Sequence, residues 1–249
     1  MRILSCIFWI CVLLSVSACV TIDQTRGTPQ EIASINIKLA KSYYSKGMFD
    51  VAEQKLQTAL GAQDDSVAAN MMLALVYQQQ GKNDQAGEQF EKTLDLTSQN
   101  SVEFAETSND YAVFLCENGN WKAAEAHFLD AVNVVAYKTK GAAYENAGFC
   151  AINAKDYKKA GLYFSEALKQ NSAMARSMLG LARVKIHRKD WLSAKILLVR
   201  FQKTTAATDE SLYLLSRVEL ELGDKAQAAE YVKQLKASFP GSTYLEKLN

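Results

Sequence analysis

The sequence predicts an all-α protein, a right-handed superhelical solenoid built from six repeated helix pairs. Alanines recur at spacings of 34 to 38 residues, at Ala52, Ala86, Ala124, Ala160, Ala194 and Ala228. A bulky apolar residue follows each alanine by four positions, and a small residue precedes each by twelve. The 249 residues include only two prolines and few strand-like alternations. A repeat of this length indicates stacked helical units rather than a sheet.

The pattern of small and bulky residues resembles the tetratricopeptide repeat, a helix–turn–helix unit. The small residues are Ala40, Ala74, Ala112, Gly148, Ala182 and Ser216. The bulky residues are Leu56, Phe90, Phe128, Phe164, Leu198 and Val232. A small residue lets two helices approach within a unit, and a bulky one fills the space toward the next unit. Because no single unit covers its own apolar face, the units must stack.

The spacing places a repeat domain at residues 33–249. Its six repeats are predicted at 33–66, 67–100, 105–138, 141–174, 175–208 and 209–242, with 101–104 and 139–140 between units. Glycine marks the turn inside four of them, at Gly47, Gly81, Gly119 and Gly223, because glycine tolerates the positive φ of a helix end. Lys155 and Lys189 replace it in the fourth and fifth repeats. We expect those two turns to form at some cost in free energy.

The N-terminal segment, residues 1–18, is predicted to be a secretory signal peptide. A basic start, Met1–Arg2, precedes the apolar run Ile3–Leu14, which is shorter than the ~20 residues that span a bilayer. The stretch Val-Ser-Ala-Cys that ends at Cys19 resembles a bacterial lipobox, which implies cleavage before Cys19 and acylation of it, palmitate included. Several acyl chains anchor a protein stably. Val20 in place of aspartate favours the outer membrane, and we expect residues 19–32 to form a lipidated tether.

Five cysteines are present, and only Cys116 and Cys150 remain after signal removal and acylation of Cys19. They lie 34 residues apart, on the first helices of neighbouring repeats. An even pair in an oxidising periplasm favours a disulfide. Two buried free thiols are the alternative, because free cysteines are often core residues.

No catalytic or cofactor signature is found. The two histidines, His127 and His187, are sixty residues apart, and neither has a zinc-ligand partner at a suitable spacing. Phosphate-binding and nucleophile-elbow motifs are absent. Without Arg2 the chain has 27 basic and 27 acidic side chains, so it lacks the basic excess of a nucleic-acid binder. We expect no enzymatic activity, metal, cofactor, small-molecule substrate or nucleic-acid partner.

The first helices are expected to line a concave groove for a partner protein. Its candidate residues are Ile37, Lys41, Tyr44, Met71, Leu75, Gln78, Asn109 and Val113. The expected groove is mainly apolar and uncharged, with Lys41 as its one cation, which suits an extended or helical apolar peptide. The alternative is that Ile37, Met71 and Leu75 are buried against neighbouring helices.

Three stretches resemble the PilF/PilW family of type IV pilus biogenesis and stability lipoproteins. They are "NDYAVFLCENGNWKAAEAHFLDAV" (109–132), "YENAGFCAI" (144–152) and "YVKQLKASFPGSTYLEKL" (231–248). The resemblance implies a pilotin, a lipoprotein on the periplasmic face of the outer membrane that helps the pilus secretin reach that membrane and multimerise. A general envelope scaffold is the rival interpretation, either as a subunit of the outer-membrane protein assembly machine or as an adaptor for peptidoglycan enzymes.

Overall fold

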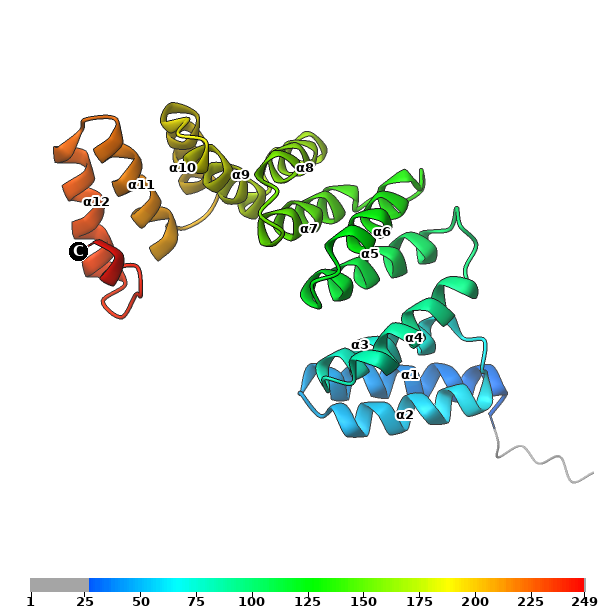
Figure 1. Cartoon of the computed structure of the whole chain (residues 1–249). Coiled ribbons are helices and arrows are strands. Elements are labelled where there is room, and N and C mark those ends of the chain that lie inside the picture. The colour runs from blue at the N-terminus through cyan, green and yellow to red at the C-terminus, as the bar shows by residue number, and fades with distance from the viewer. Residues whose placement is uncertain (1–26, 249) are drawn as a thin grey trace, which may run out of the picture.

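The structure, a computed structural model, describes residues 27–248. Within that range the chain folds into α-helices, with no strand, and ends in a short 3-10 helix, Glu246–Leu248. The helices are α1 (Pro29–Ser45), α2 (Phe49–Ala62), α3 (Val67–Gln79), α4 (Asn83–Asp95), α5 (Val102–Glu117), α6 (Trp121–Asn133), α7 (Lys140–Asn153), α8 (Tyr157–Gln170), α9 (Ala175–His187), α10 (Trp191–Thr204), α11 (Asp209–Glu221) and α12 (Lys225–Ser238). They follow one another as successive hairpins (Figure 1).

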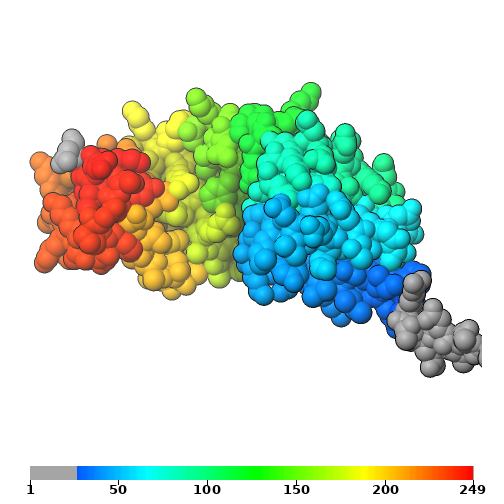
Figure 2. All heavy atoms as spheres, turned by 90° about the horizontal axis from the view of Figure 1, so that it is seen from below, coloured from blue at the N-terminus to red at the C-terminus, as the bar shows by residue number. Residues whose placement is uncertain are grey.

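The hairpins stack in one row, so the molecule is elongated (Figure 2). Each helix packs against the next along the chain, and successive first helices from α1 to α9 also touch one another. This arrangement confirms the predicted all-α solenoid. The predicted signal peptide, residues 1–18, and the predicted acylation site, Cys19, lie outside the described residues.

The recurring small and bulky residues form the core of the stack. The repeated alanines Ala52, Ala86, Ala124, Ala160 and Ala194 are fully buried. Phe164 shows why the small positions are needed, because its ring lies against both Gly148 and Gly180. A Cβ atom added to Gly148 would lie 2.6 Å from the Phe164 ring, which is closer than packed atoms approach. Any larger residue there would therefore force the Phe164 ring to move.

The first helix begins earlier than the predicted boundary. Residues 19–32 were expected to form a tether, but α1 starts at Pro29. Thr28 is its N-cap: the Glu31 amide donates to Thr28 Oγ1 over 3.2 Å, and the Thr28 amide donates to Glu31 Oε2 over 2.8 Å. This capping box, with proline at the first helical position, fixes the start of the helix. Similarly, α5 starts at Val102, inside the segment 101–104 predicted to separate two repeats.

A three-residue turn joins the two helices of every pair, and its middle residue has a left-handed φ. The glycines at this position have φ of 72° to 89°, and Lys155 and Lys189 have φ of 60° and 58°. The next residue closes the turn with a backbone bond to the first helix, for example from the Asp156 amide to the Ala151 carbonyl over 2.8 Å. The two lysines therefore adopt the glycine conformation, although a side chain there costs roughly 1–2 kcal/mol.

Replacing either lysine by glycine should stabilise the fold. We expect Lys155→Gly and Lys189→Gly each to raise the free energy of unfolding by about 1 kcal/mol, because glycine removes the Cβ repulsion of the left-handed turn. Urea denaturation measures the change. The matched control is Gly81→Lys, whose added Cβ meets nothing within 4 Å and so tests backbone strain alone. It should lower stability by a similar amount. A loss of stability in the lysine variants would contradict this account.

Candidate partner-binding groove

The first helices α3 and α5 enclose a hollow of about 430 Å³. Its apolar part comes mainly from α3 and from the segment after α6. The lining residues are Val67, Ala68, Met71, Leu75, Glu103, Glu106, Thr107, Asn109, Asp110 and Tyr137. Of the predicted groove residues, the structure therefore brings Met71, Leu75 and Asn109 together. Figure 1 shows α3 and α5 in neighbouring hairpins of the stack.

The other predicted groove residues lie around this hollow or toward the N-terminus. Gln78 Nε2 donates to Glu117 Oε2 over 2.7 Å and so links α3 to α5. Val113 packs against the central core, the buried cluster that includes Phe90, Phe114 and Phe128. Ile37 and Tyr44 are half-buried and pack against the N-terminal core, the buried cluster that includes Ala40, Leu56 and Leu73. Lys41 is exposed.

The apolar groove residues belong to the core and also reach the surface. Ile37, Met71 and Leu75 pack against core residues, yet each keeps an intermediate exposure. The same side chains thus support the fold and leave apolar surface available on the first helices.

The groove was expected to be mainly apolar and uncharged, with Lys41 as its one cation, and three acidic side chains, Glu103, Glu106 and Asp110, line this hollow. Burial raises the pKa of Asp110 above its ordinary value; the Asn109 amide, 3.0 Å away, partly opposes this, and Glu106 adds repulsion. Burial also raises the pKa of Tyr44, with Asp110 contributing. The hollow therefore combines an apolar floor with a negative wall.

The predicted groove residues leave out several residues that line the hollow, among them Asp110 and Tyr137. Asp110 follows Asn109 on the same helix and was outside the positions assumed to line the groove. Tyr137 belongs to the connection between α6 and α7, and it is buried with Ala105 and Ala143 in a separate small cluster. A helical projection of α5 would have placed Asp110 beside Glu106, four residues earlier, on one face.

The histidines do not form a site. His127 lies half-buried on α6 with its ring centroid 4.8 Å from that of Tyr111, and burial lowers its pKa. Within residues 27–248, no three His, Cys, Asp or Glu side chains gather as metal ligands. Among the helices of the same range, none is long and apolar enough to cross a bilayer.

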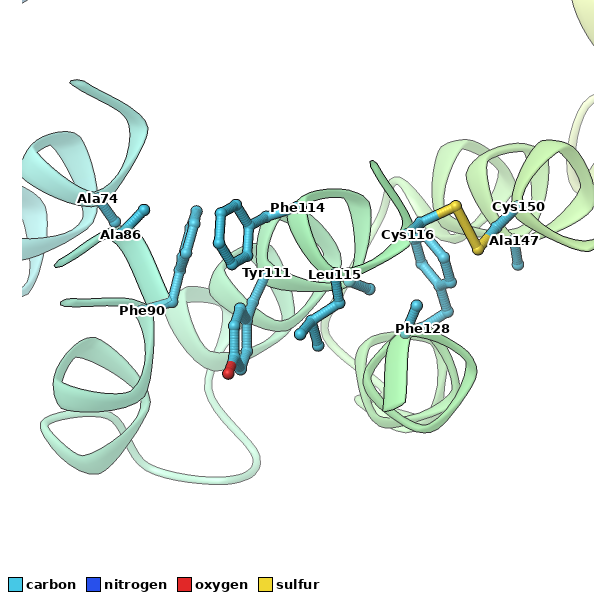
Figure 3. Close-up of a cluster of buried hydrophobic side chains, with 12 residues drawn as sticks. Ala74, Ala86, Phe90, Tyr111, Phe114, Leu115, Cys116, Phe128, Ala147 and Cys150 are labelled. Atoms are coloured by element: carbon cyan, nitrogen blue, oxygen red, sulfur yellow. A yellow bond between two sulfur atoms is a disulfide. The ribbon is translucent and has the colours of Figure 1, made fainter. Parts of the chain in front are cut away.

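A disulfide joins Cys116 of α5 to Cys150 of α7, with Cα atoms 5.7 Å apart. Both residues are buried in the central core with Phe114, Leu115 and Phe128 (Figure 3). Cys116 follows Val113 by one turn of α5, so the bridge lies at one end of the candidate groove. It fixes the position of α5 relative to α7, which are the first helices of the third and fourth hairpins.

Removing the bridge should destabilise the protein strongly. A closed loop of this length stabilises a fold by about 3–4 kcal/mol in the chain-entropy description. We expect that loss for the Cys116→Ser/Cys150→Ser variant, measured by urea denaturation. Reductant should lower the wild-type stability to the same value and leave the variant unchanged. A wild-type midpoint that ignores reductant would contradict the prediction.

Neutralising Asp110 should stabilise the protein at neutral pH. Because the folded-state pKa of Asp110 is raised, its protonated form stabilises the folded state. That stabilisation is fully present below the unfolded pKa of ~3.9 and is lost as pH rises through the folded pKa. Asp110→Asn should therefore raise the free energy of unfolding at pH 7 and change it little at pH 3. The comparison variant is Asp65→Asn, which makes the same substitution at an exposed position outside the hollow. Equal effects of Asp110→Asn at both pH values would refute the assignment.

Comparison with known proteins agrees with the helix-pair architecture. Two models described as tetratricopeptide repeat match residues 37–101 and 210–242. The type IV pilus assembly protein PilF of Pseudomonas aeruginosa is 28% identical over 206 residues, which cover 83% of this chain and 80% of that protein. An uncharacterized protein of Haemophilus influenzae is 27% identical over 139 residues, covering 56% of this chain and 75% of that protein.

Two solved structures share the fold over most of their length. The structure of Pseudomonas aeruginosa PilF superposes with a TM-score of 0.77 at 26% identity, covering 88% of this chain and 97% of that one. PilW, described as a widely conserved type IV pilus biogenesis factor, gives a TM-score of 0.77 at 26% identity, covering 88% and 98%. The chain thus contains tetratricopeptide repeats at residues 37–101 and 210–242, and it resembles the type IV pilus proteins PilF and PilW along most of its length.

Proposed function

We propose that the chain is an outer-membrane lipoprotein required for type IV pilus biogenesis, which binds the pilus secretin and promotes its localisation and multimerisation. The observation that carries this proposal is the similarity to PilF, which extends over 83% of the chain, together with the shared architecture of PilF and PilW. Residues 1–18 direct export, and acylation of Cys19 holds the protein at the periplasmic face of the outer membrane.

Recognition takes place in the concave groove, centred on the hollow between α3 and α5. Met71, Leu75 and Tyr137 supply apolar contact area for a side chain of the secretin segment. Glu106 and Asp110 lie beside this area and favour a segment that also carries a cation, since complementary charges set specificity. An extended or helical peptide with one apolar anchor next to Lys or Arg fits both features.

The Cys116–Cys150 bridge contributes rigidity to this site. Because it fixes α5 against α7, the α5 wall of the groove is ordered before a partner arrives. A binding surface that is already ordered loses less conformational entropy on association. The disulfide therefore serves recognition as well as stability in this proposal.

A general envelope scaffold is the second candidate, because an apolar groove with a negative wall also suits a barrel-assembly or peptidoglycan-enzyme partner. The proteins that co-purify with tagged, detergent-solubilised chain distinguish the two candidates. Recovery of secretin favours the pilotin role, and recovery of an assembly protein or hydrolase without secretin favours the scaffold.

The groove itself is tested by charge insertion. Met71→Glu and Leu75→Glu should each reduce heat-resistant secretin multimers and surface pili several-fold. The introduced carboxylate would have to lose its water against the apolar anchor of the partner, which costs free energy. The control is Leu129→Glu, which adds the same charge on α6 at a side chain already 40% exposed. Immunoblots of membrane fractions and pilus counts give the readout.

The anchor is tested separately. Cys19→Ser should abolish acyl labelling and move the secretin multimers away from the outer membrane, while leaving the purified protein able to bind secretin.

Normal multimers in both groove variants would eliminate the groove as the binding site. Normal outer-membrane multimers in a strain without the gene would eliminate the pilotin role.

A further inference from the structure

The near-neutral net charge conceals a strong segregation along the solenoid. Residues 27–139 carry 15 acidic and eight basic side chains, whereas residues 140–204 carry 13 basic and four acidic ones. The second range comprises α7 to α10, the yellow-green part of Figure 1. The hairpins on the N-terminal side are therefore negative, and the next two are strongly positive.

The outward positions of the second helices show the same change. In each second helix, the residues two before and two after the recurring alanine are exposed. In α2 and α4 these are Asp50, Gln54, Asp84 and Glu88, and in α8 and α10 they are Lys158, Leu162, Leu192 and Ile196. Equivalent positions therefore carry acidic or amide groups at one end and aliphatic or basic groups further along.

The aliphatic side chains at these positions are largely exposed to solvent. Leu162, Leu192 and Ile196 are 60%, 63% and 61% exposed. A hollow of about 570 Å³ between α8 and α9 joins Leu162 to Lys158 and Arg188 on one surface. Leu162 therefore borders a hollow lined by basic side chains, and apolar surface with a charged rim is typical of interaction surfaces.

The turn lysines add a further sign that cations are needed here. Lys155 and Lys189 occupy left-handed positions that glycine fills in the other four hairpins. In sequence, Lys155 lies three residues before Lys158, and Lys189 lies three residues before Leu192. Within residues 27–248 no carboxylate pairs with Lys155, Lys158 or Lys189, whereas Lys159 and Lys185 have acidic partners at 2.6 and 2.9 Å. A strained residue that persists without a structural partner points to function.

We propose that these residues form a basic–aliphatic face, made of Lys155, Lys158, Leu162, Lys189, Leu192 and Ile196, that docks on an anionic phospholipid surface. The aliphatic side chains enter the boundary between headgroups and acyl chains, and the lysines contact lipid phosphates. An acidic polypeptide would satisfy the lysines, but strongly exposed aliphatic side chains among these cations match a bilayer interface better. The proposal goes beyond secretin binding and does not rest on it.

Lysine footprinting tests this face in the full protein. The purified protein, in the processed form that the cell exports, is incubated with vesicles of phosphatidylglycerol and phosphatidylethanolamine or of phosphatidylcholine alone. An amine-reactive reagent followed by mass spectrometry gives the labelling of each lysine. Labelling of Lys155, Lys158 and Lys189 should fall several-fold on the anionic vesicles only, and high salt should restore it. Lys46 and Lys92, on the acidic hairpins, should label equally throughout.

Variants separate docking from folding. Lys155→Gly/Lys189→Gly, which removes backbone strain, should weaken the protection of Lys158 severalfold while the melting temperature rises or stays level. Lys46→Ser/Lys92→Ser removes the same charge elsewhere and should leave the protection intact. Met71→Glu, in the groove, should also leave it intact, so this proposal and the secretin proposal can fail separately.

Three results would overturn the proposal. Equal labelling on both kinds of vesicle would exclude recognition of anionic lipid. Protection by polyglutamate but not by anionic vesicles would assign the face to an acidic polypeptide instead. Full protection of Lys158 in the Lys155→Gly/Lys189→Gly variant would show that the turn lysines do not contact the lipid.

Discussion

The close approach of two helices at a small residue is the constraint on which the whole structure depends. Ala40, Ala74, Ala112 and Ala182 are fully buried at these approaches, and a bulky residue of the second helix fills the space that opens beside each of them. A hairpin built this way still exposes an apolar side, which only another hairpin covers. Stacking is therefore the source of stability, and the curved surface that can hold a partner is its geometric result.

Sequence periodicity was sufficient to predict the elements that repeat. The spacing of Ala52, Ala86 and their successors reports helix packing directly, so the fold class and the helix pairs followed from it. The turn at Lys155 was predicted as well, because its place in the repeat is the place of a glycine. Boundaries that depend on local hydrogen bonds were less predictable. The capping box of Thr28 and Glu31 starts α1 inside the expected tether.

The candidate groove was predicted less completely, and the reasons are physical. Repeat positions placed Met71 and Leu75 on the face of α3 where the hollow lies, since that placement depends on helix phase alone. Asp110 was missed because its exposure depends on how α5 packs against α3, and Tyr137 because it comes from a connection. Glu106 and Asp110 share one face of α5, but it is the packing of α5 against α3 that brings this face to the hollow, and no single-helix pattern contains that contact. The segregation of charge between hairpins was visible in the sequence, but the total of the whole chain obscured it.

The position of the disulfide has a consequence for how the array comes apart. Units of a linear stack lose order most readily at its ends, where each has one neighbour. The covalent link between α5 and α7 encloses α6, so fraying that starts at α12 and progresses inward meets a barrier in the middle of the row. The hairpins that carry the groove are then insulated from disorder at the distal end. A transient opening of the last units would leave the partner-holding half intact.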